Sequence, residues 1–175
     1  MISTDILLLV LRVVLGLLFF GHGTQKLFGW WGGRGIEGTS KMLASLNIQP
    51  DKFWALIAGL GETLGGLGLV LGLYTPIAGA LIVSVMLMAI IKVHWKNGLW
   101  NSNRGMEYQL LNIAVASVVG LSGPGLYSLD SLLNISYPMP WTFIIAVVLG
   151  ILGVLAGLGS SVVTGQTQKM RGAEH

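Results

Sequence analysis

The sequence contains no cysteine, which excludes disulfide bonds, iron–sulfur clusters held by thiolates, and thiol exchange by this chain alone. Charged residues are also scarce. They make up 10 % of the 175 residues, whereas soluble domains average about 25 %. Because so few charges cannot cover an ordinary aqueous surface, the sequence predicts an integral membrane protein.

Hydrophobic residues make up 53 % of the chain, and most of them lie in five long apolar segments. A helix needs about 20 residues to cross the hydrocarbon core, and the third and fourth segments are somewhat shorter than that. We expect an all-α integral membrane protein in which residues 1–133 form a four-helix transmembrane bundle. Residues 134–175 are expected to form a linker, a fifth C-terminal transmembrane helix and a polar tail. The predicted spanning helices cover residues 6–28, 53–73, 77–93, 106–121 and 141–163, and a short interfacial helix covers 39–47, with Met42, Leu43 and Leu46 on one side.

All Lys and Arg residues except Arg12 lie in or beside the first loop, the third loop or the C-terminal tail of this arrangement. With five spans, these three regions face the same side of the membrane. The positive-inside rule places that side in the cytoplasm of a prokaryotic inner membrane, with the N-terminus outside and the C-terminus inside. The sequence pI near 9.4 therefore indicates topology and contact with anionic lipid headgroups rather than nucleic-acid binding.

Glu62 lies almost at the centre of the second apolar segment. A charge at the bilayer midplane costs at least about 2.5–3.5 kcal/mol, so Glu62 must be paired, protonated or hydrated. We expect its side chain to point into the bundle, because it adjoins a stripe of glycines spaced three and four residues apart. Such stripes are typical of close helix crossings in membranes. The stripe consists of Gly61, Gly65, Gly68 and Gly72, and Gly153 and Gly157 are expected to serve the fifth helix in the same way.

Ionisable and amide side chains are predicted to meet at the cytoplasmic end of the bundle. His22 and Lys26 are four residues apart and so share a helix face, and Lys92 and His94 end the third helix. Around a shared polar chamber, such groups could bond the carbonyl of a quinone and relay protons. The alternative is that they pair with one another or extend to lipid headgroups. We expect catalytic roles for His22, Lys26, Glu62, His94 and Glu107, and cofactor contacts from His22, His94, Trp95 and Gln109.

Five tryptophans fall on the predicted cytoplasmic face, where an aromatic belt is the simplest interpretation. Trp95, beside His94, is the best candidate for stacking on a bound planar ring. Arg12, near the other face, is expected to pair with Asp130 or Asp5. No metal site is predicted, because a haem held by two histidines would find no further supporting ligands.

The order of several short motifs resembles the DoxX family over about residues 6–133. These motifs lie at residues 12–16, 20–29, 61–66, 72–75, 93–94, 105–108, 123–125 and 128–130. The resemblance implies a small four-helix membrane protein of the kind often described as an oxidoreductase subunit. Some relatives accompany quinol oxidase or act in thiosulfate:quinone oxidoreduction with a second subunit, and others are associated with resistance to catechols, quinones or oxidative stress. Matching positions are His22, Lys26, Glu62, His94 and Glu107, whereas the fifth helix lies outside the family's four-helix core.

The leading functional hypothesis is a redox component that binds a quinone or a similar small aromatic molecule in a polar pocket near the cytoplasmic face. Electrons would have to come from a redox partner subunit or a bound cofactor, because no residue of this chain carries them. Two alternatives remain open: a non-catalytic scaffold for a partner complex, and a small transporter or proton pathway centred on Glu62. The bilayer is the one certain partner, and a homo-oligomer is also compatible with the sequence.

Overall fold

The computed structural model describes residues 3–172, with side chains described for residues 3–160. The described residues are mostly helical and include no strand, which confirms the predicted all-α class. The observed long helices begin within about two residues of the predicted starts, and α7 continues past the predicted end at residue 163 to Gly172. The elements are α1 (Thr4–Phe28), η1 (Trp30–Gly32), α2 (Gly35–Ser45), α3 (Asp51–Leu71), α4 (Thr75–Ala89), η2 (Ile90–His94), η3 (Trp95–Asn97), η4 (Asn101–Asn103), α5 (Glu107–Ser122), α6 (Leu129–Leu132) and α7 (Trp141–Gly172).

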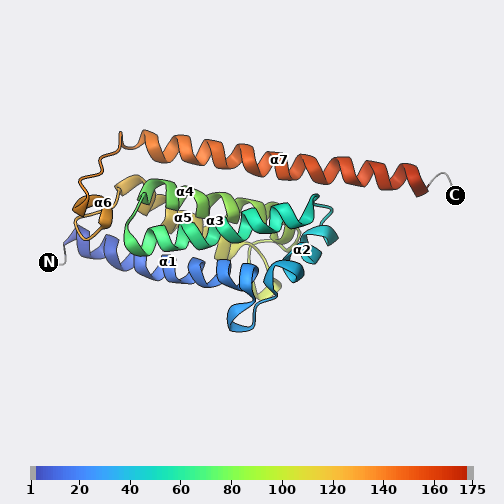
Figure 1. The fold of residues 1–175 in the computed structure, drawn as a ribbon, viewed down its shortest axis with the longest axis horizontal. Coiled ribbons are helices and arrows are strands. Elements are labelled where there is room, and N and C mark those ends of the chain that lie inside the picture. Colours follow the sequence, from blue (N-terminus) through green and yellow to red (C-terminus); the bar gives the residue numbers. More distant parts are fainter. Residues whose placement is uncertain (1–2, 173–175) are drawn as a thin grey trace.

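The five long helices run alternately in opposite directions, so the start of α1 and the end of α7 lie at opposite ends of the molecule (Figure 1). Helices α1, α3, α4 and α5 form the bundle, and α7 packs on its outside against α4. In the described part of the chain, four helices are long and apolar enough to cross a membrane: Thr4–Phe28, Asp51–Leu71, Thr75–Asn97 and Trp141–Ser160. Helix α5 has 16 residues and returns between the same two ends, as predicted for a short fourth segment.

The closest helix crossing joins α1 to α3, and it depends on glycine. A Cβ atom on Gly66 would lie 2.3 Å from the backbone nitrogen of Phe20, and one on Gly16 would lie 2.6 Å from the carbonyl oxygen of Gly66. Gly23 meets α3 in the same way, since its Cβ would lie 2.4 Å from the backbone nitrogen of Thr63. Small residues allow this approach in lipid, where helices gain no hydrophobic stabilisation from associating.

The predicted glycine stripe of α3 lies on a neighbouring face and contacts α4. Cβ atoms on Gly65 and Gly68 would lie 3.2 Å from the Ala78 carbonyl oxygen and 2.9 Å from the Ala78 Cβ. Helix α3 therefore presents one small-residue face to α1 and another to α4. Glu62 belongs to the face toward α1, and its side chain is buried as predicted.

Helix α7 contacts α4 through its own glycines. A Cβ on Gly150 would meet the Ser84 hydroxyl, and one on Gly157 would lie 2.5 Å from the Met88 methyl group. Gly153 has no atom within 4 Å of its Cβ position, so the prediction that it serves a close crossing is wrong. It lies where α7 stands clear of its neighbours.

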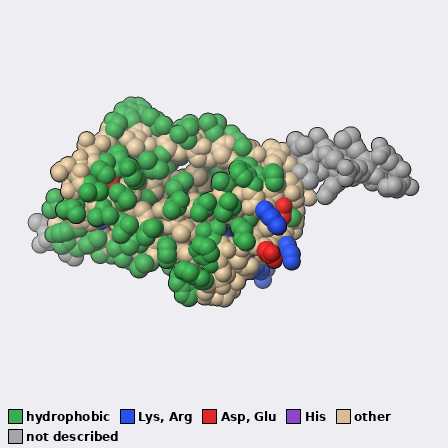
Figure 2. All heavy atoms as spheres, in the orientation of Figure 1, with side chains coloured by type: hydrophobic (Ala, Val, Ile, Leu, Met, Phe, Trp, Pro, Cys, Tyr) green, Lys and Arg blue, Asp and Glu red, His purple; other side chains and the backbone are tan. Residues whose placement is uncertain are grey.

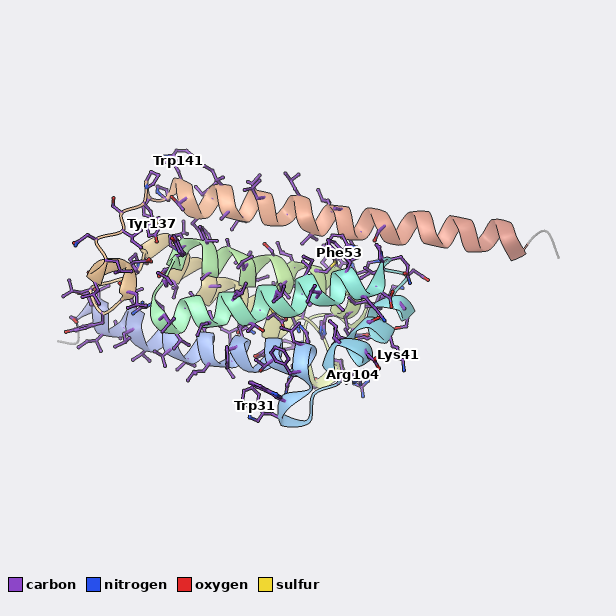
Figure 3. All side chains as sticks on the ribbon, in the orientation of Figure 1. Trp31, Lys41, Phe53, Arg104, Tyr137 and Trp141 are labelled. Atoms are coloured by element: carbon purple, nitrogen blue, oxygen red, sulfur yellow. The ribbon has the colours of Figure 1, made fainter. Side chains whose placement is uncertain are left out.

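Apolar side chains cover most of the long helices' outer surface, while charged side chains gather at the α2 end (Figure 2). Lys41 and Arg104 lie at that end, and Tyr137 and Trp141 lie at the other (Figure 3). Lipid tails can solvate exposed leucine and isoleucine, so this surface suits a protein embedded in a bilayer.

Candidate functional site

Lys26 of α1 and Glu62 of α3 form an ion pair and a hydrogen bond in which the lysine donates to Oε1. The Glu62 side chain is 1 % exposed and that of Lys26 is 29 % exposed. The other carboxylate oxygen, Oε2, is buried with no hydrogen-bond partner among the described residues. Glu62 therefore depends on Lys26 as its charge partner, because an unpaired buried charge in a medium of low polarity is strongly unfavourable.

Helix α2 packs against the end of α1 that carries Lys26. The Thr39 hydroxyl shares its one proton between the Gly35 carbonyl of its own helix at 2.8 Å and the Lys26 carbonyl at 3.2 Å, so α2 contacts the end of α1. Met42, Leu43 and Leu46 turn inward from the same helix, which confirms their predicted common side. Helix α2 therefore forms one end of an internal space rather than only an interfacial surface.

That space is an apolar crevice with a volume of about 700 Å³. Its walls come from α3, α4 and α7, and α2 closes one end. The volume falls within the roughly 300–1,000 Å³ typical of ligand sites. The polar chamber predicted from the sequence is thus replaced by an apolar crevice.

Only one end of the crevice carries charge. Lys26 and Lys92 are its ionisable lining residues, and no carboxylate lines it within the described chain. Lys92 also donates to the Leu46 carbonyl at 3.4 Å. Trp54 of α3 lies 3.7 Å from the Cβ position of Gly157 on α7, so it bridges the two walls near this basic end.

His94 belongs to a second, separate cluster. The chain leaves regular α-helical geometry over η2, a short π-helical turn of a kind often found at functional sites. His94 Nδ1 lies 2.7 Å from the Arg104 carbonyl oxygen, and Nε2 lies 2.9 Å from Gln109 Nε2. Because a carbonyl can only accept, Nδ1 carries the proton and Nε2 accepts from the Gln109 amide.

Three other predicted site residues do not join either cluster. His22 is exposed and makes an edge-on ring contact with Phe19. Glu107 is exposed, and its carboxylate accepts a hydrogen bond from the Asn101 backbone at 2.9 Å. Trp95 is 65 % exposed. The structure therefore brings Lys26 to Glu62 and His94 to Gln109, with no hydrogen bond or ion pair joining these two clusters in the described chain.

At the opposite end of the bundle, Arg12 is fully buried and donates to the Tyr127 carbonyl. The described structure has no ion pair within 4 Å between Arg12 and Asp130 or Asp5, but Asp130 does interact electrostatically with the Arg12 guanidinium. Asp5 instead accepts a hydrogen bond from the Leu126 backbone at 2.9 Å.

Asp130 is held by donors from the start of α4 and from the linker before α7. Its carboxylate accepts hydrogen bonds from the backbone nitrogens of Tyr74 and Thr75 at 2.9 and 3.0 Å. The Tyr137 hydroxyl also donates to it at 2.7 Å. Burial, together with this hydrogen bond to a carboxylate, raises the pKa of Tyr137 above its ordinary value.

Sequence reasoning missed Trp54, Lys92 and α7 as parts of one binding space. The sequence places Trp54 among the five tryptophans of a predicted aromatic belt, and it leaves Lys92 either in a polar chamber or extended to lipid headgroups. The apolar side of the predicted helix 39–47 was the sequence feature that could have indicated the crevice. The apolar face of an amphipathic helix packs against other apolar groups, and this helix lies next to the basic end of another helix.

The fold and these sites define a small helical membrane protein with a buried lysine–glutamate pair beside an apolar crevice. The sequence profile of DoxX matches residues 7–95, which contain most of α1, all of α3 and α4, and both members of the ion pair. The chain therefore belongs to the DoxX family.

Two bacterial relatives support this assignment. The chain is 32 % identical over 128 residues to a Bacillus subtilis protein named "Putative oxidoreductase CatD", covering 73 % of this chain and 87 % of the relative. It is 28 % identical over 133 residues to the Escherichia coli inner membrane protein YphA, covering 73 % of this chain and 91 % of that protein. No solved structure matches the chain.

Proposed function

We propose that this protein is a membrane component of a redox system that binds a quinone or a similar small aromatic molecule in the crevice. The observation that supports it most is the position of Lys26, which lines an apolar space and also bonds a buried carboxylate. An aromatic ring can pack against the apolar walls of the crevice, and an oxygen on the ring can accept a hydrogen bond from the Lys26 ammonium at the basic end. The name of the Bacillus relative, an oxidoreductase, is consistent with this role.

Lys26 can serve a ligand and Glu62 at the same time. A lysine ammonium has three N–H donors, and one of them is directed at Glu62 Oε1. Another can donate to a ring carbonyl, and the pair can then pass a proton to that oxygen or take one from it. The second carboxylate oxygen of Glu62 is free to hold the proton, since no described residue bonds it.

This arrangement changes the roles expected for the histidines. Both ring nitrogens of His94 already have partners, and His22 points to the exterior. Neither is among the lining residues of the crevice. We therefore assign the hydrogen bond to the ring oxygen to Lys26, with Lys92 as the second cation at the same end.

The chain supplies binding and proton transfer, and a redox partner supplies electrons. No cysteine is available to ligate an iron–sulfur cluster or to exchange with a disulfide. We place the basic end of the crevice on the cytoplasmic side of a prokaryotic inner membrane, because Lys41, Arg104 and their basic neighbours gather there.

Ring binding can be measured by the fluorescence of Trp54, the tryptophan that lines the crevice. In a variant whose other five tryptophans are phenylalanine, menadione should quench this emission in a saturable manner. Lys26→Gln should weaken the apparent affinity about tenfold, as expected for the loss of one charged hydrogen bond.

Lys41→Gln is the matched control, because Lys41 is an exposed lysine on α2 that does not line the crevice. It should leave the affinity unchanged. Thermal melting of both variants separates a binding defect from a folding defect. Absence of saturable quenching, or equal affinity in Lys26→Gln and the parent, would overturn the proposal.

A further inference from the structure

Helix α7 lies outside the four-helix bundle, yet it supplies one complete wall of the crevice. Lining residues come from its first half, residues 142–154, and include Thr142, Ala146, Gly150 and Val154. The opposite wall belongs to α3 and the floor to α4. Without α7, the lining faces of α3 and α4 would be part of the outer apolar surface.

The crevice is much longer than its charged end. Lys92 and Ile77 both line it, and fifteen residues of helix between them correspond to roughly 22 Å at a rise of about 1.5 Å per residue. A single ring beside Lys26 and Lys92 would leave most of that length unfilled.

The rest of the crevice offers little to a polar ligand. Beyond the lysines, its polar side chains include Ser84 and Thr142, and the Ser84 hydroxyl already donates to the Ala80 carbonyl at 2.7 Å. The remaining wall consists of aliphatic side chains and glycine, which suit a hydrocarbon chain.

The crevice opens toward the apolar outer surface of the helices, which lies in the membrane. Helix α7 packs on α4 but has little contact with α3, so the space opens between α3 and α7. The lining residues Ile57, Leu81, Ile145 and Leu149 are also partly exposed on the apolar surface. At the basic end, Trp54 and the α2 side chains Met42, Leu43 and Leu46 line the crevice.

We infer that α7 and α4 bind the apolar tail of the ligand whose ring lies at Lys26, so that the natural ligand is a long-tailed membrane quinone that enters between α3 and α7. This inference rests on the proposed function and narrows its substrate class. A water-soluble catechol or short-chain quinone would fill only the basic end of the crevice. Recognition of the tail is then the role of the fifth helix.

The test uses the full chain in phospholipid nanodiscs and a quinone whose long alkyl tail ends in a photoreactive diazirine. After illumination, mass spectrometry identifies the labelled peptides. Labels should concentrate on residues 77–84 of α4 and 142–150 of α7, at least fivefold above the lipid-facing side of α1. Even labelling of all lipid-facing surfaces would overturn the inference.

Two glycines of α7 provide a matched pair of variants. Neither Gly153 nor Gly159 has an atom within 4 Å of its Cβ position, so both can accept a larger side chain without a backbone clash. Gly153 lines the crevice and Gly159 does not. Gly153→Leu should lower tail labelling at least fivefold, whereas Gly159→Leu should leave it unchanged; an equal effect of the two would contradict tail binding.

Menadione quenching of Trp54 distinguishes failure of this inference from failure of the proposed function. If the ring still quenches Trp54 while tail labels are spread evenly, the tail site is refuted and the ring site stands. If neither the ring nor the tailed quinone binds, both proposals fall.

Discussion

Lys26 and Glu62 meet although one lies near the end of α1 and the other near the middle of α3. This is possible because the first part of α3 extends past the end of α1. Gly59 of α3 lies beside Leu27, almost at the last residue of α1. The preceding turns of α3 are covered by α2 instead.

Lys26 should stabilise the folded protein because its ammonium compensates the buried charge of Glu62. Lys26→Met should lower the free energy of unfolding by roughly 3 kcal/mol, because it leaves Glu62 buried without its partner. The double variant Lys26→Met with Glu62→Leu should recover most of this loss. Denaturant titration in mixed micelles measures both, with Lys41→Met as the control; a double variant no more stable than Lys26→Met would contradict this account.

The crossing of α1 and α3 should not accept even one added methyl group. A Cβ on Gly66 would lie 2.3 Å from a backbone atom of α1, and backbone cannot move aside as a flexible side chain can. Gly66→Ala should therefore destabilise the protein by about 1–3 kcal/mol. Gly159→Ala, in open space, should be neutral or stabilising by up to about 1 kcal/mol. Thermal melting in detergent compares the two, and equal melting temperatures would show that the helices are less closely packed than described.

Tyr137, in the linker before α7, should make the stability of the folded protein fall at high pH. The pKa of Tyr137 is raised in the folded state by burial and by its bond to Asp130, so its protonated form stabilises the fold. That contribution is complete below the ordinary tyrosine pKa of about 10 and is lost as the pH rises through the higher folded value. Tyr137→Phe should remove this part of the alkaline destabilisation, and absorbance at 295 nm should lose its last-titrating tyrosine. An unchanged titration curve would refute the assignment.

His94 should be found as the Nδ1–H tautomer when neutral. The Arg104 carbonyl and the Gln109 amide fix that choice from opposite sides of the ring. Nitrogen-15 chemical shifts of histidine-labelled protein report the tautomer directly. In Gln109→Leu, which leaves the Arg104 bond in place, the same tautomer should persist while the Nε2 shift changes. An Nε2–H tautomer in the parent would contradict the described geometry.

The two ends of the chain should lie on opposite sides of the membrane, with the C-terminus in the cytoplasm. Green fluorescent protein fused after residue 175 should fluoresce in bacteria, because it folds in the cytoplasm. Alkaline phosphatase fused within the loop after α6 should be active, since that loop lies at the other end of the bundle (Figure 1). The reverse pattern of reporters would invert the assigned orientation.

The helices could be predicted from the sequence because apolar length and charge placement decide them locally. The burial of Glu62 was also predictable, since a central carboxylate among glycines has no route to water from a membrane helix. Its partner was not. The choice of Lys26 depends on how far α3 slides along α1, and this is set by three-dimensional contacts such as Gly16 with Gly66.

The position of His22 also could not be predicted from residue spacing alone. His22 and Lys26 share a helix face by spacing, but Gly23 is the residue that meets α3. His22 is about 100° around the helix from Gly23, and its short side chain stays outside, while the long side chain of Lys26 reaches inward. The crevice was missed because it depends on where α7 docks, and sequence periodicity carries no such information.

The shortness of α5 has a consequence for the surrounding lipid. Its 16 residues extend over roughly 24 Å, against a hydrocarbon thickness of about 30 Å, and Leu111, Val118 and Leu121 on it face outward. The bilayer must become thinner along that flank, or the whole molecule must tilt to hide the mismatch. The longer α7 meets a bilayer of ordinary thickness, so shorter acyl chains should gather beside α5 only.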